Sequence, residues 1–207
     1  MISVKNVSLT IKNNKLLDDI SLEVSEGEAV GIVGGNGSGK TVLMKCMLGF
    51  FANFDGEIVV NDERIVKDIE FAENTGFIIE TPGFMPNMSG YENLKVLAGV
   101  NKIAGNNEIR EYMKLVGLDP DSKKKVRKYS LGMKQKLALA QAMMEKPRVL
   151  ILDEPFNGLD KGMVEKMRRV LQDEKNRGTA IFMASHNEKD IESLCDRVYE
   201  IDNGKLM

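Results

Sequence analysis

Short runs that are apolar, or that alternate apolar with polar residues, fill the first third of the chain, which is typical of β-strands. The runs are VSLTI (7–11), ISLEV (20–24) and AVGIV (29–33). A hairpin follows, because GEIVV and ERIVK flank Asn61-Asp62, two residues of the type that forms tight turns. The N-terminal third is therefore expected to be built of strands.

The middle third changes to a helical pattern. Ser89 followed by Glu92 is a capping box, so we expect a helix that opens with ENLKVLAGV. A second helix, EIREYMKLV, is expected to end at Gly117, because glycine readily adopts the conformation that closes a helix. This part of the chain is therefore predicted to be helical.

Strands and helices alternate in the last third of the chain. VLILD (149–153) and TAIFMAS (179–185) are continuous apolar runs, typical of strands buried in a parallel sheet. The amphipathic helix GMVEKMRRVLQDEKNRG lies between them, and NEKDIESLC predicts a final helix before a hairpin at Asn203-Gly204. The pattern as a whole predicts an α/β fold with a mostly parallel sheet.

Composition narrows the class of protein. The 207 residues are 43% hydrophobic and 29% charged, which suits one compact domain with room for an attached lobe. The net charge of -2 gives no overall positive field, so we expect no nucleic acid partner. Cys46 and Cys195 have no metal-type neighbours, which predicts two reduced, buried thiols in a cytoplasmic protein. Nothing resembles a leader or the roughly 18 apolar residues of a membrane span, so we expect the chain by itself neither to cross a membrane nor to leave the cytosol.

The strongest chemical motif is a glycine-rich stretch between the strand AVGIV and the helical TVLMKCML. It matches the P-loop pattern and comprises Gly34, Gly35, Asn36, Gly37, Ser38, Gly39, Lys40 and Thr41. Glycines let backbone N–H groups surround a phosphate, and the helix start adds its dipole. Lys40 is expected to contact the β- and γ-phosphates, and the Thr41 hydroxyl to ligate Mg²⁺. The alternative is a chance glycine-rich turn, which the flanking strand and helix disfavour.

A second motif places two acids at the carboxyl end of a buried strand, where ligands of open α/β sheets bind. Asp153 fits a partner of Mg²⁺, directly or through water, and Glu154 fits the base that deprotonates an attacking water. Such a base predicts hydrolysis of the nucleotide and not transfer to a hydroxyl group. The alternative is an acid pair that is merely solvated.

Further motifs occur in the order found in one family. YSLGMKQ (129–135) stands where that family has its signature motif, and the segment from Phe77 to Gly83 stands where it has its Q-loop. Asn157-Gly158-Leu159-Asp160 resembles the D-loop of the family, and His186 resembles its switch histidine. With the P-loop and the acid pair, essentially the whole chain resembles the ATP-binding subunits of ABC (ATP-binding cassette) transporters.

This resemblance implies a single domain with a P-loop NTPase core of the RecA-like type. The core, with an antiparallel β subdomain, would comprise residues 1–84 and 148–207, and an inserted helical subdomain with the signature would comprise 85–147. ATP and Mg²⁺ are the implied cofactors. The implied partners are a second ATPase subunit, identical or different and bound head to tail, and an integral membrane subunit that holds this one at the inner face of the cell membrane.

The resemblance also implies roles for single residues. Ser130 and Gly132 would contact the γ-phosphate of the partner's ATP. Asp160 would lie at the dimer interface. Glu154 and His186 would be the catalytic pair. The implied function is ATP hydrolysis that powers export through the membrane subunit.

The chain departs from the family pattern at several positions. Tyr129, Leu131 and Met133 replace residues of the usual Leu-Ser-Gly-Gly-Gln signature, a form that resembles the exporters of antibiotics, peptides and lantibiotics. Glu80 stands where most members have a glutamine that contacts Mg²⁺ or water, and a carboxylate could still ligate the metal. Ile11 falls near the place of the aromatic residue that stacks on adenine, and an aliphatic contact is expected to hold adenine less tightly.

Simpler interpretations stay open. Ser130 and Asp160 would both serve as helix N-caps without any ligand, and Glu80 as an exposed strand-end acid. The basic run 123–128 favours a solvated surface, and the thirteen methionines favour core packing. Alternative functions are an ABC-type ATPase in DNA repair or translation, and a P-loop GTPase switch. An ABC-type ATPase of DNA repair or translation would need a long coiled-coil insertion or a second cassette, and the sequence shows neither. A GTPase switch would need an Asn-Lys-x-Asp motif, whereas residues 101–104 read Asn-Lys-Ile-Ala.

Overall fold

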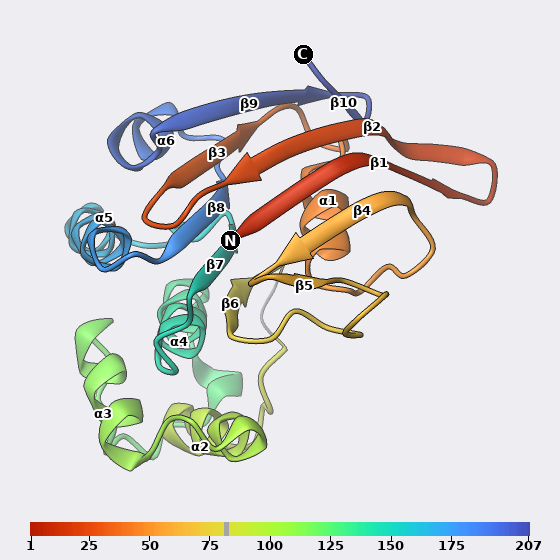
Figure 1. Cartoon of the computed structure of the whole chain (residues 1–207). Coiled ribbons are helices and arrows are strands. Elements are labelled where there is room, and N and C mark those ends of the chain that lie inside the picture. Colours follow the sequence, from red (N-terminus) through yellow and green to blue (C-terminus); the bar gives the residue numbers. More distant parts are fainter. Residues whose placement is uncertain (81–82) are drawn as a thin grey trace.

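The computed structural model describes residues 1–80 and 83–207 of the chain (Figure 1). Thr81 and Pro82, two residues of the segment predicted as the Q-loop, lie outside the described residues. The strands form two sheets, as the fold class predicted from the sequence requires. One sheet is antiparallel and the other is mostly parallel.

The antiparallel sheet comes from the N-terminal third and has the order β2-β1-β4-β5. Its strands are β1 (Ile2–Ile11), β2 (Asn14–Val24), β4 (Asp55–Val60) and β5 (Glu63–Arg64). The first two strands are longer than predicted, because Lys12 and Asn13 alone make the turn between them, both with positive φ. The strand predicted as ERIVK is shorter, because Val66 also has a positive φ, which side chains rarely adopt and which ends the pairing.

The second sheet has the order β10-β9-β3-β8-β7-β6, and only the β10–β9 pair is antiparallel. Its strands are β3 (Ala29–Val33), β6 (Thr75–Ile78), β7 (Val149–Asp153), β8 (Ala180–Ala184), β9 (Arg197–Asp202) and β10 (Lys205–Leu206). Strands β3, β8 and β7 are neighbours and run in one direction. Their carboxyl ends therefore meet at one edge, where the P-loop, the acid pair and His186 follow.

The helices confirm the predicted ones, with the ends shifted by a few residues. They are α1 (Lys40–Met47), α2 (Gly90–Asn101), α3 (Asn106–Leu115), the 3-10 turn η1 (Val126–Lys128), α4 (Leu131–Met143), α5 (Lys161–Asn176) and α6 (Glu188–Leu194). The capping box of α2 is present, since Glu92 N donates to Ser89 Oγ at 3.2 Å and Ser89 N to Glu92 Oε2 at 2.6 Å. Figure 1 shows α2, α3 and α4 grouped at one end of the molecule.

The parallel sheet divides the hydrophobic core in two, because successive side chains of a strand point to opposite faces. Val149 and Ile151 of β7 pack with α1 and the antiparallel sheet. Leu150 and Leu152 pack with the helices α2 to α6 on the other face. Among the described residues, no helix combines the length and the apolar character that crossing a bilayer requires.

The two thiols are both free. Cys46 is buried, as predicted, whereas Cys195 is only half-buried and not buried as predicted. Burial raises the pKa of each thiol to about 12, so both are protonated at neutral pH. This protonation makes them poor nucleophiles and favours a packing role.

Candidate active site

The P-loop lies where β3 ends and α1 begins, and residues 34–37 are exposed there. Its inner side is tightly packed, because a Cβ at Gly34 would lie 2.2 Å from the backbone oxygen of Ile201. Its outer side is open, because a Cβ at Gly35 or Gly37 would meet no atom within 4 Å. The predicted residues thus form an open loop at a helix start, which fits a phosphate group.

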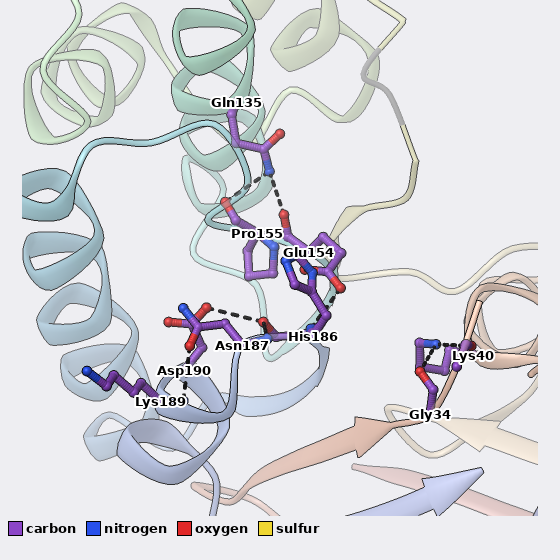
Figure 2. A network of polar contacts seen from close by, with 11 residues as sticks. Gly34, Lys40, Gln135, Glu154, Pro155, His186, Asn187, Lys189 and Asp190 are labelled. Atoms are coloured by element: carbon purple, nitrogen blue, oxygen red, sulfur yellow. Dashed lines mark hydrogen bonds and ion pairs between the residues drawn. The ribbon is translucent and has the colours of Figure 1, made fainter. Parts of the chain in front are cut away.

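Lys40 lies over this loop. Its Nζ donates to the backbone oxygens of Gly34 at 2.7 Å and Gly35 at 2.8 Å (Figure 2), and lies 3.4 Å from Oγ of the buried Ser38. The ammonium group is therefore held at the mouth of the loop by weak neutral acceptors. A phosphate oxygen would be a stronger acceptor for the same donor.

Thr41 and Asp153 are brought together by the sheet, although 112 positions separate them in the chain. The Thr41 hydroxyl, at the start of α1, donates to Asp153 Oδ2, at the end of β7, at 2.6 Å. Two hard oxygen atoms beside a phosphate loop fit Mg²⁺, which takes one or two protein ligands and completes its shell with phosphate oxygens and water. The described residues contain no cluster of three or more His, Cys, Asp or Glu that would hold a metal without such help.

Glu154 and His186 follow neighbouring strands and face each other (Figure 2). His186 Nδ1 lies 2.8 Å from Glu154 Oε2, and the His186 backbone N–H donates to Oε1 at 2.9 Å. Glu154 N donates to the backbone oxygen of Ala184 at 3.0 Å. Glu154 also has φ +49, a conformation that non-glycine residues adopt rarely and that often marks a functional site. The pair therefore presents an oriented, partly exposed carboxylate.

The start of the signature helix α4 contacts the turn before α5. Ser130 is the N-cap of α4, with its Oγ accepting from Met133 N at 3.3 Å, and Asp160 is the N-cap of α5. A Cβ at Gly132 would lie 2.4 Å from the backbone oxygen of Gly158. The capping roles that the sequence left open are thus present, and the glycine is explained by a close backbone approach within the chain.

A match to a protein-family model shows to which family the chain belongs. The model for the ABC transporter family matches residues 17–157, which include the P-loop, the signature and the acid pair. The chain belongs to the ABC transporter family. It is an ATP-binding subunit of that family and an ATPase.

Relatives with curated names agree with this assignment. The chain is 42% identical to the uncharacterized ABC transporter ATP-binding protein YybJ of Bacillus subtilis, over 100% of this chain and 94% of that one. It is 39% identical to the bacitracin transport ATP-binding protein BcrA of Bacillus licheniformis, over 99% of this chain and 68% of BcrA. It is 31% identical to the lantibiotic transport ATP-binding protein SrtF of Streptococcus pyogenes, over 100% of this chain and 89% of SrtF.

Solved structures confirm the fold. An ATP-binding subunit of an ABC transporter superposes with a TM-score of 0.90 at 26% identity, over 99% of this chain and 87% of that one. A dimeric ATP-binding cassette in a post-hydrolysis state, bound to ADP and Pi, superposes with a TM-score of 0.88 at 22% identity, over 100% and 96%. The second likeness supports the fold alone.

Two residues that the ABC family pattern singles out have other contacts in this structure. Glu80 has an exposed side chain and pairs with Lys45 of α1, Nζ to Oε1, at 2.6 Å. Ile11 ends β1 opposite Asn14 and is half-buried against the core of the antiparallel sheet. Neither residue is joined to the other site residues by a hydrogen bond or an ion pair in the structure described here.

Gln135 of this ABC subunit is not among the functional residues predicted from the sequence. Gln135 is buried in α4, and its Nε2 donates to the backbone oxygens of Glu154 at 3.2 Å and Pro155 at 2.9 Å (Figure 2). A signal was available, because Gln135 shares the buried stripe of α4 with Leu139 and Ala142. A polar residue on such a stripe needs a hydrogen-bonding partner.

A buried carboxylate that was not predicted from the sequence, that of Asp190, stabilises the turn that carries His186. Asp190 of α6 is buried, accepts from Arg168 Nε at 3.1 Å and accepts from Ser185 Oγ at 3.2 Å. Ser185 directly precedes His186. The buried carboxylate therefore fixes the turn that carries the histidine. In the sequence Asp190 is only one of several acids in a polar helix start, and nothing distinguishes it.

Proposed function

We propose that this ABC ATPase binds ATP with Mg²⁺, pairs head to tail with a second ATPase subunit, and powers export of an antibiotic, peptide or lantibiotic-like molecule through a separate membrane subunit. It would work in the cytoplasm, at the inner face of the cell membrane. The single observation that carries the hydrolytic part is the alignment of Glu154 by His186 beside the Thr41–Asp153 pair.

Phosphate binding is assigned to the P-loop backbone and to Lys40. The ammonium group exchanges the carbonyl oxygens of Gly34 and Gly35 for oxygens of the β- and γ-phosphates. Thr41 and Asp153 would hold Mg²⁺, which when bound neutralises charge that develops on the phosphates. Glu80 would contact the metal or its water only after its ion pair with Lys45 opens.

Glu154 is assigned as the base. Its carboxylate takes a proton from water, the water oxygen bonds to the γ-phosphorus, and the bond to the bridging oxygen breaks, which gives ADP and phosphate. The His186 backbone N–H donates to Oε1, the His186 ring lies beside Oε2, and these two contacts limit the direction of the carboxylate. His186 thus acts by orienting the base.

The start of α4 supports the proposed dimer. This helix has 13 residues, and its N-terminal N–H groups and the exposed Ser130 are available to an anion. In a head-to-tail pair, Ser130 and Gly132 would approach the γ-phosphate in the partner's site, and Asp160 would lie near the contact. A solved cassette with the same fold is dimeric, which supports the proposed pairing.

The membrane partner has a candidate surface near Glu80. Phe50 and Phe71 are 46% and 50% exposed, and their rings lie 6.1 Å apart, edge to face. Phe50 also contacts Phe77 of β6, the strand that leads to Glu80. Exposed apolar groups of this kind mark interaction sites, and this surface would receive the membrane subunit.

Two relatives support the proposed kind of substrate, because they are named as bacitracin and lantibiotic transport ATP-binding proteins. The test is to express the chain with a membrane protein encoded beside it in a sensitive host. We expect the inhibitory concentration of bacitracin or a lantibiotic to rise, and Lys40→Ala to abolish the rise. No change with both proteins present would refute this substrate class.

Nucleotide selectivity needs its own test, because Ile11 offers no aromatic ring to adenine. We expect ATP to compete better than GTP for the purified chain, and Ile11→Tyr to strengthen ATP binding through stacking. Preference for GTP would favour the switch-like alternative. An unchanged affinity in Ile11→Tyr would remove Ile11 from the adenine site.

A further inference from the structure

Gln135 joins helix α4 to the turn that follows β7. Its side chain is only 5% exposed, and both hydrogens of its Nε2 are used by the carbonyl oxygens of Glu154 and Pro155. The opposite amide orientation would place an oxygen against two oxygens. The side chain therefore has one favourable orientation, and it links α4 to the turn after β7.

Glu154 requires such support because its backbone is in the left-handed region, with φ +49. Three elements hold it in place. Ala184 of β8 accepts its N–H, His186 holds its carboxylate, and Gln135 of α4 holds its carbonyl oxygen. A shift of any one of them changes the direction of the carboxylate.

The same helix begins at the proposed clamp for the partner's nucleotide. Ser130 caps α4 five positions before Gln135, a rise of about 7.5 Å along one rigid helix. At its first turn α4 also packs Gly132 against the Gly158 carbonyl. A displacement of the helix start by a bound phosphate would therefore reach the turn that carries Glu154.

We propose that Gln135 is a positioning residue that couples the start of the signature helix to the carboxylate of Glu154. Engagement of the partner's ATP at Ser130 would thus align the base that acts on this chain's own ATP. The inference rests on the proposed roles of Ser130 and Glu154. It adds a route between the two sites that passes through one buried amide.

The experiment compares Gln135→Glu and Gln135→Leu in the full chain. A carboxyl group at this position donates to one of the two carbonyls when it is protonated, and a carboxylate donates to neither. We expect the turnover of Gln135→Glu to be roughly 10- to 100-fold below wild type at pH about 8 and to recover, relative to wild type, as the pH falls towards about 6. Gln135→Leu should lose a similar factor at every pH, because it never donates.

ATP affinity is the second readout, since the P-loop is untouched. We expect the Kd for ATP to stay within twofold of wild type in both variants. Gln141→Glu, the same chemical change at a half-buried position of α4, is the matched control and should follow the wild-type pH profile.

Several results would overturn the proposal. Turnover within twofold of wild type in both variants would show that the hydrogen bonds do not orient Glu154. Equal losses at every pH in both variants, or a loss of folding or ATP affinity in either one, would assign Gln135 a structural role only. The proposed function fails separately, if wild-type ATPase activity survives Glu154→Gln.

Discussion

The backbone N–H of His186 donates to Glu154 Oε1 at 2.9 Å, and Nδ1 of the same histidine lies 2.8 Å from Glu154 Oε2. The two residues follow β7 and β8, which are adjacent parallel strands. The contact is therefore built by sheet register and not by a local turn. It fixes the direction of the carboxylate and leaves part of it accessible to water.

Glu154→Gln tests the base. An amide cannot take a proton from water, so we expect turnover to fall by roughly 10²–10⁴-fold while ATP binding is retained. An ATP-bound dimer should accumulate, visible by size-exclusion chromatography. Glu165→Gln, the same change at an exposed position of α5, should have no effect. Turnover within a factor of two of wild type would remove Glu154 from this role.

Substitutions of Ser130 can distinguish its role as a helix cap from the proposed role in phosphate binding. Asp and Asn both cap helices about as well as Ser, so Ser130→Asp and Ser130→Asn should keep the stability of α4 to within about 0.5 kcal/mol. Only Asp adds a negative charge, which would repel the partner's γ-phosphate. We expect Ser130→Asp alone to block ATP-dependent dimerisation while the ATP affinity of the dilute monomer is unchanged. If both variants dimerise equally well, Ser130 is a cap and nothing more.

Much of this architecture could be predicted from the sequence, because it depends on local patterns. The P-loop, the acid pair after VLILD and the caps at Ser130 and Asp160 are all contiguous motifs. Contacts between distant elements that lie outside these motifs could not be predicted. Gln135 lies 20 positions from Pro155, and the Lys45–Glu80 pair depends on where α1 lies relative to the end of β6. Such contacts are determined by tertiary packing, which no single stretch encodes.

Gly132→Ala tests the close approach of α4 to the turn before α5. The added Cβ would fall 2.4 Å from the backbone oxygen of Gly158, which cannot move as a flexible side chain does. We expect a loss of about 1–3 kcal/mol in the free energy of unfolding, measured in urea. Gly162→Ala is the control, because its Cβ would meet only Asp160 Oδ1 at 3.5 Å. An equal effect in both variants would contradict the predicted clash.

The contact of Glu28 with Arg197 is expected to make the stability of the protein depend on pH. The Arg197 guanidinium bonds both oxygens of Glu28, at 2.5 and 3.1 Å, and lowers the pKa of that carboxyl below its usual 4.5. A lowered folded-state pKa stabilises the protein above the unfolded-state pKa, and this stabilisation is lost as the pH falls through the folded-state value. Glu28→Gln should therefore lower Tm at pH about 7, and the difference from wild type should shrink at pH about 3. A difference that is constant with pH would exclude this contribution.

Phe71→Glu tests the surface proposed for the membrane subunit. A charge among the exposed rings should remove the apolar contact and weaken co-purification with the membrane subunit roughly tenfold or more, because a buried unpaired charge is costly at an interface. The ATPase activity of the separate chain should stay within twofold of wild type, because Phe71 is not part of the active site. Val198→Glu is the control, with a similar exposure of 49% on β9, in the sheet edge formed with β10. Equal co-purification of both variants would place the membrane contact on a different surface.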